Sequence, residues 1–298
     1  MLKKISDLHE LAKKGKTRKL VLAAAHDANA MDAAINASKE GIIELIMVGD
    51  KKKIEEIASE RNFAIDNMQI IDKPIAEEAA ATSVKMVSNK EADILMKGNI
   101  GTAGLLRAVL NKEWGLRTGE LLSHLAIFEL PTYHKIIGLT DAAMNIAPDL
   151  SGKISLIRNS VNYFRSVGID QPKVALLSAV ETVNPDMQST IDASIIAKMA
   201  HRKQIKNCIV DGPLAFDNAV STKSAEIKKI ESPVAGDVDI LVGDDIDASN
   251  GLYKAFIYFA KAKCAAVIVG AAAPIVLTSR ADNDETKLNS IAMAAAIN

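Results

Sequence analysis

The sequence predicts an α/β protein of two domains with largely parallel sheets. Three observations lead to this fold class. Short apolar runs alternate with longer segments of helical composition along most of the chain, which is the βα order of a parallel sheet. Hydrophobic residues make up 49% of the sequence but aromatic residues only 4%, so the cores must be aliphatic, as suits α/β layers. The length of 298 residues is at the upper limit for one core, which favours two domains.

The first part of the chain is expected to form four strands joined by helices. The expected strands span residues 19–25, 43–48, 68–71 and 93–96, and the expected helices span 27–39, 51–61 and 75–89. This alternation indicates right-handed crossovers between parallel strands, and ligands bind beyond the carboxyl ends of such strands. His26 lies at one of these ends, where we expect a structural role for it.

A hairpin marks the expected border to the second domain. Apolar runs at 125–130 and 133–139 are separated only by Pro131 and Thr132, a spacing typical of antiparallel strands. Further on, strands are expected at 173–178, 208–211, 239–242, 265–269 and 274–278, and helices at 150–167, 185–201, 248–262 and from about 285. We therefore expect one domain from residues 1–126 plus 272–298, with residues 127–271 inserted as the second.

One stretch of the first domain has the composition of an anion site. An apolar run ends at Lys97, glycines follow at Gly98 and Gly101, and apolar residues then recur at helical spacing. With Thr102 as the expected N-cap, the helix start offers N–H groups and a partial positive charge. Arg107 can reach back toward that start, because helical side chains lean toward the N-terminus. Lys97 and Asn99 approach from the turn. The alternative is a tight βα turn with a surface arginine.

A second polar cluster follows the last expected strand, at Ser279, Arg280, Asp282, Asn283 and Asp284. An arginine presents a planar fork of donors to phosphate oxygens. A neighbouring acid can act as a base, and a hydroxyl can donate to a developing oxyanion. One of the three residues 282–284 is expected simply to cap the final helix.

Four stretches together resemble the phosphate acetyltransferase and phosphate butyryltransferase family, and more closely its butyryl-transferring branch. They are KGNIGTAGLLR at 97–107, DAAMNIAP at 141–148, DGPLAFDNAV at 211–220 and SRADNDETKLNSI at 279–291, with a weaker fifth, NGLYK, at 250–254. The resemblance implies two three-layer α/β/α domains with a cleft between them. It also implies a homodimer or a larger homo-oligomer, and reversible transfer of an acyl group between coenzyme A and phosphate.

The resemblance also suggests roles for residues. Ser279 and Arg280 match a Ser-Arg pair of the family's active site, and Thr102 and Arg107 match residues at its phosphate-binding helix. Thr286 stands where the acetyl branch has its basic aspartate. The general base is therefore undecided, and the candidates are two nearby acids, Asp282 and Asp284. The residues expected on the coenzyme A side of the cleft are Asp141, Asn145, Asp217, Asn218, Asn250 and Lys254. Local capping or loop hydrogen bonding is the alternative for each of these six.

The expected reaction needs only small substrates. A coenzyme A thiolate would attack an acyl phosphate directly in a ternary complex, so no metal or redox cofactor is expected. A net charge of -1 with mixed signs gives no reason to expect nucleic acid or an anionic membrane as a partner. Cys208 and Cys264 lie in apolar runs and are expected to be buried thiols. The N-terminus lacks the apolar core of a signal peptide, so a cytoplasmic protein is expected.

Three other functions remain open from the sequence. The first is a phosphate acetyltransferase, because the sequence does not fix the preferred acyl chain. The second is a decarboxylating dehydrogenase of similar architecture, which would need an acidic metal cluster and a nicotinamide site. The third is a non-catalytic module that senses acyl-CoA. Scattered aspartates and the lack of a dinucleotide fingerprint count against the dehydrogenase, and retention of Ser279, Arg280 and Arg107 counts against the sensor.

Overall fold

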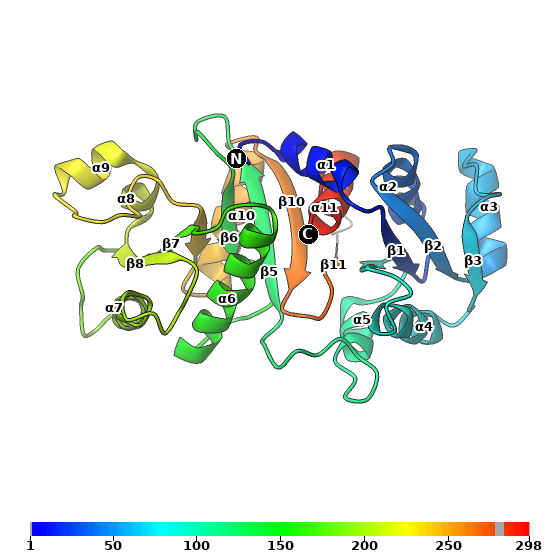
Figure 1. The fold of residues 1–298 in the computed structure, drawn as a ribbon, viewed down its shortest axis with the longest axis horizontal. Helices are drawn as coiled ribbons and strands as arrows, with labels where there is room; N and C mark the ends of the chain where they lie inside the picture. The colour runs from blue at the N-terminus through cyan, green and yellow to red at the C-terminus, as the bar shows by residue number, and fades with distance from the viewer. Residues whose placement is uncertain (1, 278–282, 298) are drawn as a thin grey trace. The chain divides into compact units, whose positions relative to one another are not determined.

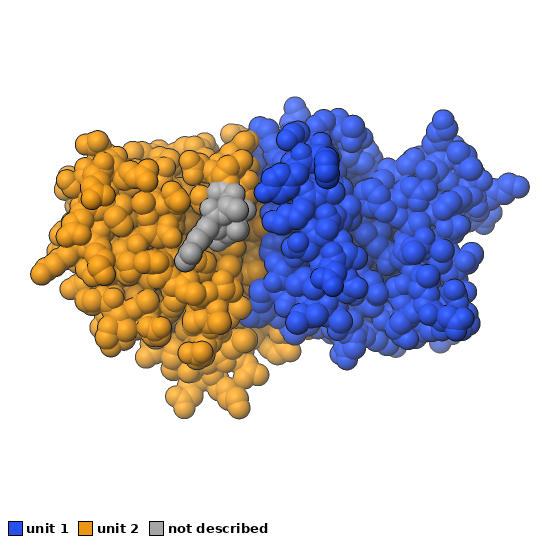
Figure 2. Space-filling view, turned by 180° about the vertical axis from the view of Figure 1, so that it is seen from behind, with its two compact units in different colours: residues 1–7, 121–264 blue, residues 8–120, 265–298 orange. Residues whose placement is uncertain are grey.

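The computed structural model describes residues 2–277 and 283–297, and the chain divides into two compact units (Figure 2). Unit 1 consists of Met1–Asp7 and Leu121–Cys264, and unit 2 of Leu8–Glu120 and Ala265–Asn298. The borders therefore lie at 120/121 and 264/265, where the sequence suggested 126/127 and 271/272. The first strand of the hairpin pairs within unit 1, whereas Arg117 and Ala271 form a bridge within unit 2. Helix α1 (Ile5–Lys14) contains the border at 7/8.

Unit 2 contains a mainly parallel sheet in the order β3-β2-β1-β4-β11-β10. Its strands are β1 (Arg18–Ala23), β2 (Ile43–Gly49), β3 (Gln69–Asp72), β4 (Ile94–Lys97), β10 (Lys263–Val269) and β11 (Ile275–Val276). All neighbours from β3 to β11 run parallel, and only β10 runs antiparallel to β11. The buried, aliphatic strands β1, β2 and β4 follow the sequence expectation.

Helices cover both faces of this sheet, as expected for three layers. They are α2 (Ala28–Lys39), α3 (Lys51–Arg61), α4 (Ala76–Ser88), α5 (Thr102–Val109) and α11 (Asp284–Ala295). Helix α2 packs against α11, and α4 packs against α5 on the other side of the strands (Figure 1). From β1 the chain builds outward to β2 and β3, and then returns to place β4 on the other side of β1. The strand order thus reverses between β1 and β4, and ligands bind at the carboxyl ends of strands at such a reversal.

The strands of unit 1 are mainly parallel and follow the order β5-β6-β9-β7-β8. Its strands are β5 (Ser123–Glu129), β6 (Ile137–Thr140), β7 (Lys173–Leu177), β8 (Ile209–Leu214) and β9 (Ile240–Val242). Strands β5 and β6 form the expected antiparallel hairpin, but β6 begins at Ile137 and not at residue 133, so the connection is longer than Pro131 and Thr132. The other pairs are parallel.

The helices of unit 1 also lie on two faces. They are α6 (Leu150–Ser166), α7 (Gln188–His201), α8 (Phe216–Val220), α9 (Thr222–Ile227) and α10 (Ile246–Tyr258). Helix α6 lies in front of the strands in Figure 1 and contacts α7, whereas α10 lies behind them. The rings of Phe216 and Phe256 are 5.9 Å apart, which joins α8 to α10. No helix in the part of the chain described here is long and apolar enough to cross a membrane.

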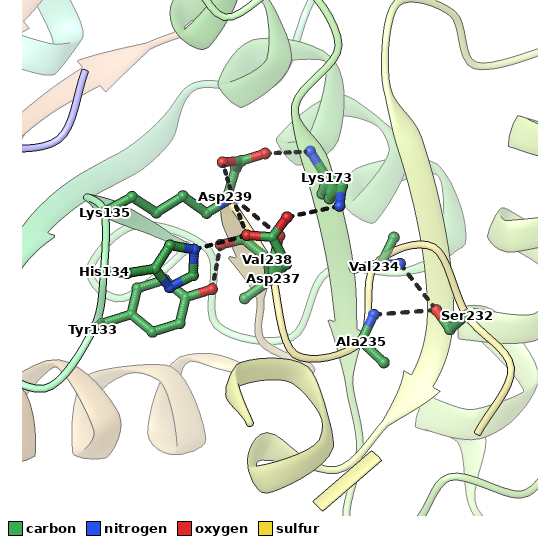
Figure 3. A network of polar contacts seen from close by, with 10 residues as sticks. All are labelled: Tyr133, His134, Lys135, Lys173, Ser232, Val234, Ala235, Asp237, Val238 and Asp239. Carbon is green, nitrogen blue, oxygen red and sulfur yellow. Dashed lines mark hydrogen bonds and ion pairs between the residues drawn. The ribbon is translucent and has the colours of Figure 1, made fainter. Parts of the chain in front are cut away.

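A polar network ties together the amino ends of three strands of unit 1 (Figure 3). Lys135 Nζ lies 2.6 Å from Asp239 Oδ1 and 2.9 Å from Asp237 Oδ1, and Lys173 Nζ lies 2.7 Å from Asp237 Oδ2. His134 Nε2 lies 2.8 Å from Asp237 Oδ1. Burial alone would raise the pKa of Asp237, but the hydrogen bonds from Lys173, Lys135 and His134 outweigh it and leave the pKa well below its usual value.

Several local expectations need correction. Helix α7 begins at Gln188 and not at Pro185. The Thr190 hydroxyl accepts from the N–H of Asn184 and donates to its carbonyl, which keeps residues 184–187 in a turn before the helix. Helix α5 has Gly101 as its N-cap, so Thr102 is the first helical residue and not the cap. Cys208 is only half-buried, since it lies in a turn before β8, whereas Cys264 is buried as expected.

Candidate functional site

The turn after β4 is fixed tightly against the end of β1. The N–H of Gly98 donates to Ala23 O at 2.9 Å, and the N–H of Asn99 donates to Ala24 O at 2.7 Å. A Cβ atom at Gly98 would lie only 2.8 Å from Ala23 O, so a residue with a side chain does not fit this approach. The glycine therefore lets the two strand ends meet where the strand order reverses.

The start of α5 is open to solvent and to an anion. Gly101 provides no side-chain cap, and its carbonyl accepts from the N–H groups of Gly104 and Leu105. Within the described residues, no group accepts a hydrogen bond from the N–H of Gly101, Thr102 or Ala103, and all three residues are exposed. Unsatisfied donors at the positive end of the helix dipole favour a bound anion.

The start of α2 beside it is already satisfied. The carboxylate of Asp27 accepts from the N–H groups of Asn29 and Ala30 at 3.1 and 3.0 Å. His26, just before this cap, has a buried Nδ1 with no partner among the described residues. Burial lowers the pKa of His26, and the charge of Lys53 lowers it further. Of the two helix starts at the reversal, only that of α5 can receive an anion.

The predicted cations take different positions around this turn. Arg107 is exposed on α5 and makes no hydrogen bond or ion pair with another described residue. Lys97 bends back onto the turn, where its Nζ donates to Gly98 O at 3.1 Å and to Ile100 O at 3.2 Å. Asn99 is exposed in the same turn. The structure thus brings Lys97, Asn99 and Thr102 together at one strand end, with Arg107 on the helix that follows.

The second predicted cluster is described only in part. Ser279, Arg280 and Asp282 lie outside the described residues. Asn283 caps α11 by accepting from the N–H of Thr286 at 2.8 Å, which confirms that one residue of 282–284 is a cap. Asp284, whose side chain is 74% exposed, lies 3.5 Å from Lys287 Nζ in the first turn of α11.

In unit 1, Asp141 is the centre of a buried hydrogen-bond network. Its Oδ1 accepts from the N–H groups of Ala143 and Met144, both at 2.9 Å. Its Oδ2 accepts from the N–H of His124 at 3.1 Å and from the side-chain amide of Asn145 at 2.6 Å. Asn145 also donates to Leu122 O. Loop hydrogen bonding, the alternative given for these two residues, is what the structure shows.

The remaining candidates of unit 1 fall into two groups. The side-chain amide of Asn250 donates to Ala142 O at 2.9 Å, which places Asn250 beside the Asp141 loop. Lys254, one turn further along α10, is exposed with its ammonium 5.2 Å from the centre of the Tyr253 ring. Asn218 lies elsewhere, in α8, where it is buried and donates to Glu181 at 3.3 Å.

Asp217, next to Asn218 in α8, faces solvent. Its carboxylate lies 3.9 Å from the ammonium of Lys228, and 51% of its side chain is exposed. This position fits a surface ion pair, which contributes little to stability.

Sequence reasoning missed a cavity of about 510 Å³ in unit 1 whose lining includes several charged residues. Lys153 lines it and is buried, with its Nζ 2.7 Å from Asp192 and 2.5 Å from Asp244. Burial would lower the pKa of Lys153, but the hydrogen bonds to the two aspartates outweigh it and raise the pKa. Asp149 and Asp245 add further carboxylates, so the cavity disfavours phosphate groups. No sequence spacing could reveal it, because its charged residues come from distant segments.

The geometry defines an α/β protein with an uncapped, exposed helix start at a strand reversal, and comparison with known proteins gives its family. The family model "Phosphate acetyl/butaryl transferase" matches residues 4–81 and 73–295. The chain belongs to this family and is therefore an acyltransferase.

Individual relatives agree over nearly the whole chain. The chain is 44% identical to a phosphate butyryltransferase of Clostridium beijerinckii, covering 100% of this chain and 98% of the relative. It is also 44% identical to a phosphate acetyltransferase of Thermotoga maritima, covering 98% of each. A crystal structure of a branched-chain phosphotransacylase from Enterococcus faecalis superposes with a TM-score of 0.82 at 34% identity, covering 93% of this chain and 98% of that one.

Proposed function

We propose that the protein transfers an acyl group reversibly between acyl-CoA and inorganic phosphate, giving an acyl phosphate and coenzyme A. The observation that carries the proposal is the open start of α5 at the strand reversal, with exposed Arg107 on the same helix. Membership of a family whose relatives are named for phosphate and acyl groups supports it.

The proposed step is a direct displacement in a ternary complex. In the direction of acyl-CoA synthesis, the coenzyme A sulfur forms a bond to the carbonyl carbon while the bond from that carbon to phosphate oxygen breaks. The thiol proton goes to a base, Asp282 or Asp284, since the thiolate is the nucleophile. The Ser279 hydroxyl donates to the carbonyl oxygen as negative charge develops there. Arg280, Arg107 and the start of α5, with Thr102 and Asn99, hold the phosphate, and Lys97 supports the turn that leads into that helix start.

This reaction is complete without a metal or redox cofactor, because coenzyme A and phosphate are both substrates. Lys254 is suited to the phosphates of coenzyme A through its exposed ammonium, and Asn250 and the loop held by Asp141 would lie on the same side of the substrate. Asp217 and Asn218, in α8, complete the residues proposed for that side. We further propose a homodimer or larger homo-oligomer acting in the cytoplasm.

The test is an acyl-transfer assay in which coenzyme A release is followed at varied phosphate and acyl-CoA concentrations. Phosphate-dependent release that saturates in both substrates is expected. Binding of acyl-CoA without turnover would instead indicate a sensing module. Oxidation of a 2-hydroxy acid that depends on metal and NAD would indicate the dehydrogenase.

The acyl chain preference belongs to the same assay. We propose that butyryl- or isobutyryl-CoA is used more efficiently than acetyl-CoA, because few large aromatics are available to close the acyl pocket. Phe216, which is 39% exposed, is one of those few. Each methylene in an apolar pocket is worth about 1–3 kcal/mol of discrimination. A higher kcat/KM for acetyl-CoA would identify a phosphate acetyltransferase instead.

A further inference from the structure

Two peptide groups of the turn after β4 share one cationic partner. Lys97 Nζ donates to the carbonyls of Gly98 and Ile100 at 3.1 and 3.2 Å. Hydrogen bonds from an ammonium are stronger than those between neutral groups. The Gly98 carbonyl also accepts from the N–H of Ile100 at 2.9 Å, so the half-buried lysine matters most for the Ile100 carbonyl, which accepts from no other described group.

The two peptides differ at their N–H ends. The peptide that begins at the Gly98 carbonyl ends in the Asn99 N–H, which donates to Ala24 O at 2.7 Å. The peptide that begins at the Ile100 carbonyl ends in the Gly101 N–H, which has no acceptor among the described residues. A trans peptide is planar, with its N–H and C=O on opposite sides. Because Lys97 holds the Ile100 carbonyl, the Gly101 N–H of the same peptide points away from the Lys97 ammonium.

We propose that Lys97 is a positioning residue of the phosphate site, which orients and polarises the Gly101 N–H for the bound anion instead of contacting phosphate itself. The inference rests on the proposed function, because it takes phosphate as the anion. Gly101 then adds a third donor to those of Thr102 and Ala103. An ammonium on the carbonyl oxygen also makes the N–H of that peptide a better donor.

Three variants test this role: Lys97→Met, Lys97→Arg and, as the control for loss of one surface charge in the same unit, Lys112→Met. Lys97→Met should raise the KM for phosphate about tenfold, which corresponds to one oriented hydrogen bond, with the KM for acyl-CoA unchanged. Hydrogen exchange of the amides in residues 98–104 should also become faster. Lys97→Arg should restore most of both properties, because a guanidinium can donate to both carbonyls, and Lys112→Met should match wild type.

Two results would overturn the inference. An unchanged KM for phosphate in Lys97→Met would show that the turn does not need the lysine. A raised KM with unchanged amide exchange would show that Lys97 contacts phosphate directly. Lys97→Gln, which keeps a donor group but loses the positive charge, replaces Lys97→Met if that variant does not fold.

The proposed function can fail separately. If wild type shows no acyl transfer, amide exchange is measured with inorganic phosphate alone. Protection of residues 98–104 in wild type and its loss in Lys97→Met would still support the role of Lys97. Equal protection of both proteins would exclude it.

Discussion

The side-chain amide of Asn145 donates to Oδ2 of Asp141 at 2.6 Å, and the same amide reaches Leu122 O at 2.9 Å. The pair therefore joins the loop after β6 to the segment before β5. Asp141 also accepts from three backbone N–H groups, so each of its two carboxylate oxygens accepts two hydrogen bonds within unit 1. Asp141 thereby holds the loop whose Ala142 carbonyl accepts from Asn250.

The first prediction follows from this network. Asp141→Asn replaces one acceptor oxygen by an amide that cannot accept, leaving two of the four donors without a partner. We expect the free energy of unfolding to fall by about 2–4 kcal/mol, measured by urea denaturation. Asp66→Asn, at an exposed position, is the matched control and should change it by less than about 0.5 kcal/mol. Equal stability of the two variants would show that the Asp141 network does not hold the loop.

The second prediction concerns the anion site. Arg107→Lys keeps the charge but loses the planar fork, so it should weaken phosphate use and lower kcat while affinity for coenzyme A changes little. Arg107→Ala should cost more, on the order of 3 kcal/mol in transition-state stabilisation. Steady-state kinetics with phosphate and acyl-CoA varied separately provide the measurement, and Arg61→Ala is the control for loss of an exposed arginine. A rise only in the KM for acyl-CoA would assign Arg107 to the phosphates of coenzyme A.

The third prediction concerns the base. Either Asp282→Asn or Asp284→Asn should lower kcat by about 10²–10⁴-fold, the usual contribution of general base catalysis. The other variant should keep its kcat. If Asp284 is that other residue, Asp284→Asn should lower the free energy of unfolding by no more than about 1 kcal/mol. The Asp284 carboxylate is exposed, so solvent weakens its ion pair with Lys287. Normal kcat in both variants would exclude both acids.

The fourth prediction concerns stability in acid. The pKa of Asp237 is lowered in the folded state, so the ionised carboxylate stabilises the fold above the unfolded pKa near 3.8, and this stability is lost as pH falls below that value. Asp237→Asn should therefore lower Tm at neutral pH, by an amount that shrinks as pH falls below 4. Exposure of the side chain limits the effect to about 1 kcal/mol. A Tm difference that is the same at pH 2.5 and pH 7 would contradict this explanation.

The sequence predicted the fold better than the details of the site. Alternating apolar runs identified β1, β2 and β4, since buried parallel strands are continuously apolar, and two adjacent runs identified the hairpin of β5 and β6. Boundaries were less certain: Thr102 has the chemistry of a cap, but the extended residue before the helix is Gly101. A capping preference reflects the chemistry of a side chain. The position of a helix start depends instead on the backbone, which changes from extended to helical dihedral angles after Gly101.

The site residues differ in the same way. Glycines and cations near a strand end predicted the turn at Gly98, but not that Lys97 would bond to carbonyls of its own turn. The partners of Asp141 were also hidden, since the His124 N–H lies on another strand. Lys153 could not be linked to Asp192 or Asp244, which are 39 and 91 residues away along the chain. Tertiary hydrogen bonds between distant segments leave no periodic trace in a sequence.

The open start of α5 has a consequence for the pH profile of the enzyme. Peptide N–H groups do not ionise in the physiological range, and an arginine stays charged throughout it. In the proposed binding mode, phosphate held by the amides of residues 101–103 together with Arg107 therefore meets the same donors in mildly acidic and mildly alkaline solution. Any change in phosphate affinity between those conditions must then come from the protonation of phosphate itself. Protonation of groups on the protein, such as the general base, would then change kcat and not the affinity for phosphate.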